Sequence, residues 1–374
     1  MKFVVSSGAL LNHVQLINGV ITSNPSPVVP ILEFFLFDVK DSTLTLYATN
    51  LETSMITSLQ IESKAKGRVA VPAKILLETL KNLGEQPLTF NIQEQTNTIE
   101  ITSDYGKYRL AGEQGDDFPR IPEADSKATA NIPSNMLAKA ISKTIFAVGN
   151  DELRPAMTGV FFQLDKKEAT FVGTDAHKLV RYKRTDISGE KAVSFIVPKK
   201  SLQQLRSILP SGSENVSITY TNSNAFFTFG TTTLICRLIE QKYPDYNAVI
   251  PRDNSSTLTI NRLSFLSSLK RVIIFSNKTT TQIVLKMAGS ELTVSAQDLD
   301  FSSEASEKLI CSYEGPDLEI GFNGKFLIEM ISALESDEVI FKLSGPSRAG
   351  VLLPAEKEDA EDLLMLVMPV MLVT

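Results

Sequence analysis

The chain carries an internal repeat with a period of about 125 residues. Pro119, Pro244 and Pro369 each follow an apolar or aromatic residue, and 125 residues separate each from the next. Short similar runs recur at nearly the same interval, at positions 48–50, 173–175 and 296–298. A unit of this length has the size of a whole domain and is too long for a solenoid repeat. The 374 residues therefore predict three tandem domains, over 1–125, 126–251 and 252–374.

Composition predicts an ordered, soluble protein of a reducing compartment. Apolar residues make up 43% of the chain, enough for three ordinary cores. Its two cysteines, Cys236 and Cys311, cannot form a disulfide framework. The opening MKFVVSSGALLNHV fits a strand followed by a helix better than a signal peptide, and no apolar run is long enough to span a bilayer. We therefore expect a cytoplasmic protein.

Each repeat reads as two similar halves, each with one short amphipathic helix among β-type runs. Pro72, for example, opens a helix with Leu76, Leu80 and Leu83 on one face. The six expected helical spans are 7–22, 74–84, 136–149, 199–209, 262–275 and 325–335. Six helices embedded in a β-rich chain predict an α+β fold.

The positive charge is concentrated in these helices, although the chain as a whole carries −6. At 100° per residue, seven basic side chains point away from the apolar stripes. They are Lys74, Lys81, Lys139, Lys143, Lys200, Arg271 and Lys325. A solvated helix face explains any one of them, and Glu78, Glu329 and His13 interrupt the pattern. Their recurrence in five helices of an acidic protein favours a polyanion such as DNA.

Four segments give the chain a family resemblance. They are 152–160 (ELRPAMTGV), 173–179 (GTDAHKL), 243–251 (YPDYNAVIP) and 367–372 (VMPVML). In this order and at this spacing, the chain resembles the bacterial sliding clamps, the beta subunits of DNA polymerase III, over its whole length.

The resemblance implies three copies of a clamp domain, each with two helices on the inner side and antiparallel sheets on the outer side. It further implies a head-to-tail homodimer that closes a ring on duplex DNA without reading its sequence. The contact between subunits would include Tyr108, Leu110, Ile274 and Phe275. Geometry permits such a ring, because twelve helices ~9 Å apart leave an opening of roughly 24 Å.

The resemblance also implies a hydrophobic groove for short peptides of the polymerase III alpha subunit, the clamp loader, other polymerases and repair proteins. Its residues here would be Met157, Thr174, His177, Lys178, Leu179, Pro244, Val249, Leu366, Val367, Met368, Pro369, Val370 and Met371. The apolar, methionine-rich end of the chain supports an adaptable pocket. Departures from the family pattern at Ala176, Lys178, Ala248 and Met371 leave the preferred peptide open. Asn24 and Asp151 occupy loop positions that can contact DNA in the family.

Two other classes of function remain as alternatives. An enzyme is disfavoured, because His13 and His177 lie in different repeats without metal-ligand spacing or an activated nucleophile. We accordingly expect no cofactor, no metal and no catalytic residue. A β-rich scaffold that does not bind DNA would explain the repeat, but it would not explain the basic helices.

Overall fold

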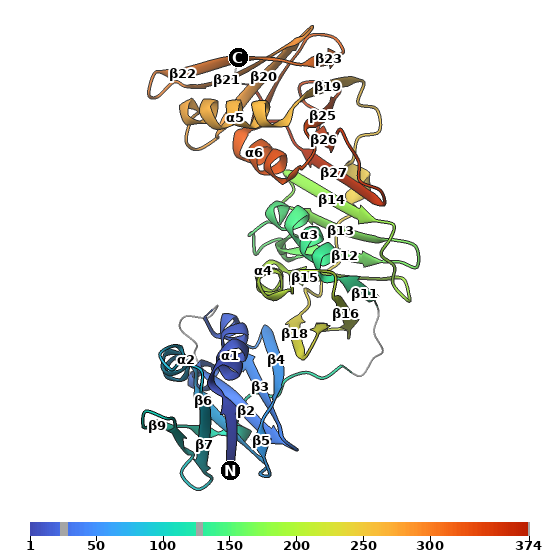
Figure 1. Ribbon diagram of the computed structural model, residues 1–374. Coiled ribbons are helices and arrows are strands. Elements are labelled where there is room, and N and C mark those ends of the chain that lie inside the picture. Colours follow the sequence, from blue (N-terminus) through green and yellow to red (C-terminus); the bar gives the residue numbers. More distant parts are fainter. Residues whose placement is uncertain (23–28, 125–129, 373–374) are drawn as a thin grey trace. The chain divides into compact units, whose positions relative to one another are not determined.

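The computed structural model describes residues 1–22, 29–124 and 130–372, and it divides into two compact units (Figure 1). The first unit comprises residues 1–136 and 200–238, and the second comprises 137–199 and 239–374. The division runs through the second repeat, because one continuous sheet ties each half of that repeat to a neighbouring repeat. Asn24, Val373 and Thr374 lie outside the described residues.

The first unit contains two antiparallel sheets. The smaller has the strand order β5 (Glu62–Ser63), β1 (Lys2–Ser6), β7 (Pro87–Gln93), β8 (Thr98–Thr102), β9 (Lys107–Ala111). The larger has the order β10 (Glu113–Gln114), β6 (Gly67–Pro72), β2 (Phe34–Lys40), β3 (Thr43–Thr49), β4 (Thr53–Gln60), β18 (Thr232–Arg237), β17 (Asn224–Phe229), β16 (Asn215–Tyr220), β11 (Ala130–Pro133). Its β4–β18 pair joins the first repeat to the second.

Neutral hydroxyl groups reinforce the β4–β18 pair. The Thr57 hydroxyl lies 2.8 Å from His13 Nδ1 and 3.0 Å from the Thr232 hydroxyl. Nearby, the Thr53 and Ser201 hydroxyls are 2.7 Å apart. Burial lowers the pKa of His13, so its ring is uncharged at neutral pH. These side-chain contacts across the junction are therefore hydrogen bonds between uncharged groups.

The second unit repeats the plan with two further antiparallel sheets. The larger has the order β15 (Val193–Pro198), β12 (Gly159–Leu164), β13 (Ala169–Thr174), β14 (Lys178–Arg184), β27 (Glu361–Val367), β26 (Gly350–Pro354), β25 (Glu338–Leu343), β19 (Ser256–Asn261), β23 (Ser312–Glu314). The smaller has the order β22 (Ser303–Ile310), β21 (Glu291–Asp298), β20 (Gln282–Ala288), β24 (Leu318–Asn323). The β14–β27 pair joins the second repeat to the third.

All six expected helices are confirmed within the described residues. They are α1 (Ser7–Thr22), α2 (Ala73–Lys81), α3 (Ser134–Thr144), α4 (Lys199–Ile208), α5 (Arg262–Val272) and α6 (Gly324–Ala333). Asn261 and Asn323 cap α5 and α6, because their side-chain oxygens accept from backbone N–H groups of the first turn. Two helices continue into a single 3-10 turn, α3 into Ile145–Ala147 and α5 into Ile273–Phe275.

The end of the chain returns to the third repeat. Strand β27 ends at Val367, as the following Pro369 predicts. Beyond it, Val370 N donates to Gly321 O at 2.9 Å and forms an isolated bridge to β24. A side chain on Gly321 would collide with Val370 O and Leu372, so glycine permits this close approach. Among the described helices, none is long and apolar enough to cross a membrane.

Candidate functional site

An apolar cluster fills the junction between the second and third repeats. Its buried members come from both repeats: Val172, Leu179, Ile196, Tyr243, Ala349 and Leu366. Phe161 stacks on Tyr243 with ring centroids 4.6 Å apart. Because packed interiors deform little, this cluster is a rigid base for the partly buried apolar residues that pack against it.

The predicted groove residues divide into a buried and an accessible set. Thr174, Leu179, Leu366 and Val367 are almost fully buried, and Val367 has no exposed surface. Val367 therefore offers no side-chain surface to a bound peptide, and its place in the groove stays a prediction. Val249, Met368 and Met371 are 56%, 41% and 82% exposed. His177 is exposed, and Met157, Pro244, Pro369 and Val370 are partly buried.

A backbone contact fixes the tail beside the β13–β14 loop. Met368 N donates to His177 O at 2.8 Å, so the residue after β27 is anchored to the second repeat. A cavity of about 370 Å³ is lined by Met157, His177 and Lys178 together with Phe326 and Glu329 of α6. The structure thus brings these three predicted groove residues together at the junction.

Lys178 connects β14 to α6 through an ion pair, and its side chain does not project into solvent. Its side chain is 6% exposed, and its ammonium pairs with Glu329 of α6. It also lies 3.7 Å from the Asp175 carboxylate and 4.4 Å from the centre of the Phe326 ring. A buried ammonium with these partners fixes α6 against β14.

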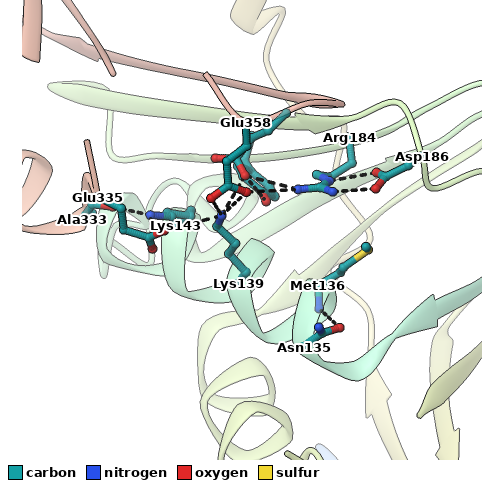
Figure 2. Close-up of polar contacts among 11 residues, drawn as sticks. Asn135, Met136, Lys139, Lys143, Arg184, Asp186, Ala333, Glu335 and Glu358 are labelled. Carbon is teal, nitrogen blue, oxygen red and sulfur yellow. Dashed lines mark hydrogen bonds and ion pairs between the residues drawn. The ribbon is translucent and has the colours of Figure 1, made fainter. Parts of the chain in front are cut away.

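Lys139 and Lys143 form a second ionic connection between the same repeats. Figure 2 shows both side chains directed from α3 towards acidic residues of the third repeat. Lys139 Nζ lies 2.8 Å from Glu358 and 2.9 Å from Glu361. Lys143 Nζ donates to Ala333 O at 2.6 Å and to Glu335 at 2.7 Å.

These contacts bear on the prediction that both lysines face DNA, because they pair the two ammonium groups with carboxylates of the third repeat. Lys143 is only 5% exposed, and the Lys139 side chain is 23% exposed. They point away from the apolar stripe of α3, as the helical angle predicts, but the third repeat lies opposite them. Their charges are consequently neutralised within the chain.

The ionic network includes Arg184 of β14, and the basic side chains of the network lower the pKa values of two carboxyl groups. Arg184 pairs with Asp186 (Figure 2). It also pairs with Glu361 at 3.3 Å. A hydrogen bond from Lys143 lowers the pKa of the Glu335 carboxyl. A hydrogen bond from Lys139 likewise lowers the pKa of Glu358. Both carboxylates are therefore held in the charged form.

The other predicted DNA-facing residues have different surroundings. Lys74, Lys81, Lys200 and Lys325 are exposed, and none of the ion pairs found in the described residues involves them. Arg271 makes a two-pronged contact with Glu307 of β22, with N–O distances of 2.7 and 2.6 Å. The four lysines thus keep their charge available, whereas Arg271 shares its charge with a carboxylate.

The four expected subunit-contact residues lie in two places, the outermost strand β9 and the 3-10 turn after α5. Ile274 and Phe275 are 71% and 40% exposed at the end of α5. Tyr108 is partly buried, and Leu110 is 8% exposed on the outermost strand, β9. In the part of the chain that the structure describes, no cluster of His, Cys, Asp and Glu could hold a metal ion.

Family comparisons cover nearly the whole chain. Family models of the DNA polymerase III beta subunit match residues 1–122 (N-terminal domain), 131–245 (central domain) and 247–369 (C-terminal domain). The beta sliding clamp of Pseudomonas putida is 28% identical over 367 residues, which cover 98% of this chain and 99% of that one. The clamp of Bacillus subtilis is 25% identical over 381 residues, 99% of each chain.

Solved structures agree with these matches. The DNA polymerase III beta subunit of Pseudomonas aeruginosa superposes with a TM-score of 0.93 at 26% identity and covers 100% of both chains. A sliding clamp of the same species bound to griselimycin gives a TM-score of 0.92, also at 26% identity and full coverage.

Acidification is expected to release the ionic network. Because the folded-state pKa values of Glu335 and Glu358 are lowered, their stabilising contribution is present above the ordinary glutamate pKa of about 4.3 and is lost as the pH falls below it. The variant Lys143→Met should therefore cost about 1–2 kcal/mol of unfolding free energy at pH 7 and clearly less at pH 3.

Chemical unfolding at both pH values measures this difference. Lys325→Met, which removes an exposed lysine without an ion pair, is the matched control and should show little change. A cost for Lys143→Met that stays constant between the two pH values would contradict the assignment.

Proposed function

The chain belongs to the DNA polymerase III beta subunit family, the sliding clamps, and on this premise we propose how it closes on DNA and holds its partners. It is a non-catalytic DNA polymerase processivity factor. Two copies close head to tail into a ring, encircle duplex DNA in the cytoplasm and slide along it. The ring tethers the polymerase III alpha subunit, the clamp loader, and other polymerases and repair proteins that carry clamp-binding peptides.

The observation that carries the ring is a pair of unmatched strand edges. Strand β4 of the first repeat pairs with β18 of the second, and β14 of the second pairs with β27 of the third. Strand β22 of the third repeat is the equivalent of β4 and β14, and β9 of the first repeat is the equivalent of β18. Each of these two strands lies at the end of its sheet without a neighbour on its outer side. Since exposed strand edges favour pairing, two copies satisfy both edges twice under twofold symmetry.

The 3-10 turns after α3 and α5 support the same arrangement. Phe146 is the middle residue of the first turn, and it lines a cavity with Phe326 and Glu329 of the next repeat. Ile274 is the middle residue of the second turn, and it is 71% exposed. A partner subunit would cover Ile274 in the same way that α6 lies beside Phe146 within the chain.

For DNA we propose diffuse contacts from a reduced set of lysines. Lys74, Lys81, Lys200 and Lys325 retain free charge, whereas Lys139 and Lys143 hold two repeats together. Exposed lysines contact phosphates, which gives affinity without sequence preference. Arg271 contributes less to this surface, because Glu307 neutralises it.

For partners we propose a groove above the apolar cluster, with Met157, Pro244, Val249 and Met368 as its accessible walls. Leu179 and Leu366 form the floor from below, since both are 3% exposed. A peptide of the type glutamine, leucine, any residue, leucine, phenylalanine would insert its apolar side chains here. Lys178 holds α6 against β14 through its ion pair with Glu329, and it does not contact the peptide directly.

Ring closure predicts selective retention on circular DNA. The native protein should stay on nicked circles and leave linear DNA through its ends. The double variant Ile274→Asp, Phe275→Asp should be a folded monomer that is lost from both, because dimerisation would bury unpaired charge. Sedimentation and gel filtration with each DNA measure this. Unchanged dimers would place the interface elsewhere.

Removing the free lysines should weaken DNA binding without affecting the dimer. Reversal of Lys74, Lys200 and Lys325 to glutamate should lower affinity for duplex DNA and flatten its salt dependence, since fewer counterions are released. Lys286→Glu, a reversal on strand β20, is the control. Fluorescence anisotropy at several salt concentrations tests this, and an unchanged salt slope would contradict it.

Truncating two groove walls should weaken peptide binding. Val249→Ala with Met368→Ala should reduce affinity for the peptide at least about tenfold, because a few buried apolar contacts dominate so small an interface. Leu263→Ala, which shortens an equally exposed apolar residue on α5, is the control. Titration calorimetry decides the point. Equal binding by all three proteins would exclude this groove.

A further inference from the structure

One loop in each of the first two repeats contacts the next repeat. In the first repeat Glu52 O, just before β4, accepts from Arg237 N at 2.9 Å. In the second repeat His177 O, just before β14, accepts from Met368 N at 2.8 Å. The loop before the edge strand therefore makes a backbone contact with the neighbouring domain in both internal junctions.

The corresponding loop of the third repeat is longer. In each repeat the side chain of the first loop residue accepts a hydrogen bond from the backbone N–H two residues later. These first residues are Asn50, Asp175 and Asp298. The next strand begins at Thr53 and Lys178 in the first two repeats, after two intervening residues. In the third repeat it begins at Ser303, after four.

The longer loop carries two exposed apolar side chains. Leu299 is 78% exposed and Phe301 is 75% exposed. They lie where β21 turns into β22, the strand whose outer edge is free (Figure 1). Large apolar residues beside a free strand edge mark a contact surface.

The internal junctions also give the expected register between subunits. Thr53 lies opposite Cys236, and Lys178 lies opposite Val367. Leu110 occupies the position in the first repeat that Cys236 occupies in the second. Two residues beyond Leu110, Gly112 N donates to Asn97 O, and two residues beyond Cys236, Leu238 N donates to Ser223 O in the same way. Ser303, the first residue of β22, should then lie opposite Leu110 of the partner subunit.

This register brings opposite charges together and extends past the strands. Glu304 would face Arg109 of the partner subunit, and both side chains are exposed in the single chain. Directly opposite charged residues stabilise antiparallel pairs. One position further, Ser302 O would accept from the backbone N–H of Ala111 of the partner subunit, as Glu52 O and His177 O do within the chain.

We propose that the enlarged β21–β22 loop is a clasp on a second copy of this chain, in which Leu299 and Phe301 pack against the partner's segment 111–114. This clasp rests on the proposed dimer and adds an apolar contact from a loop that is two residues longer than its equivalents at the two internal junctions. It holds the third repeat to the first repeat of the partner subunit.

Charged substitutions test the clasp. Leu299→Asp with Phe301→Asp should raise the dimer dissociation constant at least about tenfold, while each subunit keeps its circular dichroism spectrum and unfolding midpoint. Leu51→Asp, in the equivalent loop of the first repeat and 57% exposed, is the control and should leave the dimer unchanged. Analytical ultracentrifugation over a dilution series measures all three.

A disulfide tests the register independently. Ser302→Cys with Ala111→Cys should give covalent dimers on oxidation, because directly opposite residues have Cα atoms about 5.5 Å apart. Ser302→Cys with Lys107→Cys is the control, since four residues displace the second thiol by about 13 Å. Native Cys236 and Cys311 are buried and should not interfere.

The outcomes separate the two proposals. A native chain that is monomeric at micromolar concentration would remove the ring itself. A stable native dimer that tolerates Leu299→Asp with Phe301→Asp would overturn the clasp alone, as would cross-linking of position 302 to 107 in place of 111.

Discussion

Strand pairing across repeat boundaries is the interaction on which the rest of the structure depends. A strand edge presents N–H and C=O groups that need partners, and the sheets of each repeat end in such edges. The β4–β18 and β14–β27 pairs satisfy four of them and fuse neighbouring repeats into continuous sheets. The positions of the apolar cluster, the ionic network and the tail all follow from the second of these pairs.

The same pairing explains why a sequence period and a compact unit are different things. The 125-residue period correctly indicates three copies of one domain, because each copy repeats the same order of helices and strands. Contacts, however, divide the chain inside the second copy. Hydrogen bonding between residues as distant as Lys178 and Val367 leaves no mark on a local pattern.

Helices could be predicted well, since a buried stripe such as Leu76 and Leu80 has a period that only a helix satisfies. The surroundings of polar residues could not. A helical angle shows that Lys143 points away from its own core, but it does not show that Ala333 and Glu335 lie opposite. Lys178 was similarly expected in the groove, and its environment depends on Phe326, about 150 residues away in sequence.

The two internal junctions differ in a way that temperature and salt should reveal. Hydroxyl groups and a neutral histidine connect β4 to its neighbours, whereas lysine, arginine and glutamate side chains surround the β14–β27 pair. Hydration of charged groups becomes less favourable on heating, so ion-pair networks lose less strength than neutral contacts as temperature rises. Added salt acts in the opposite sense, because it screens the partly exposed charges and leaves the hydroxyl contacts unaffected. A chain built from three copies of one domain thus joins them by two connections with opposite environmental sensitivities.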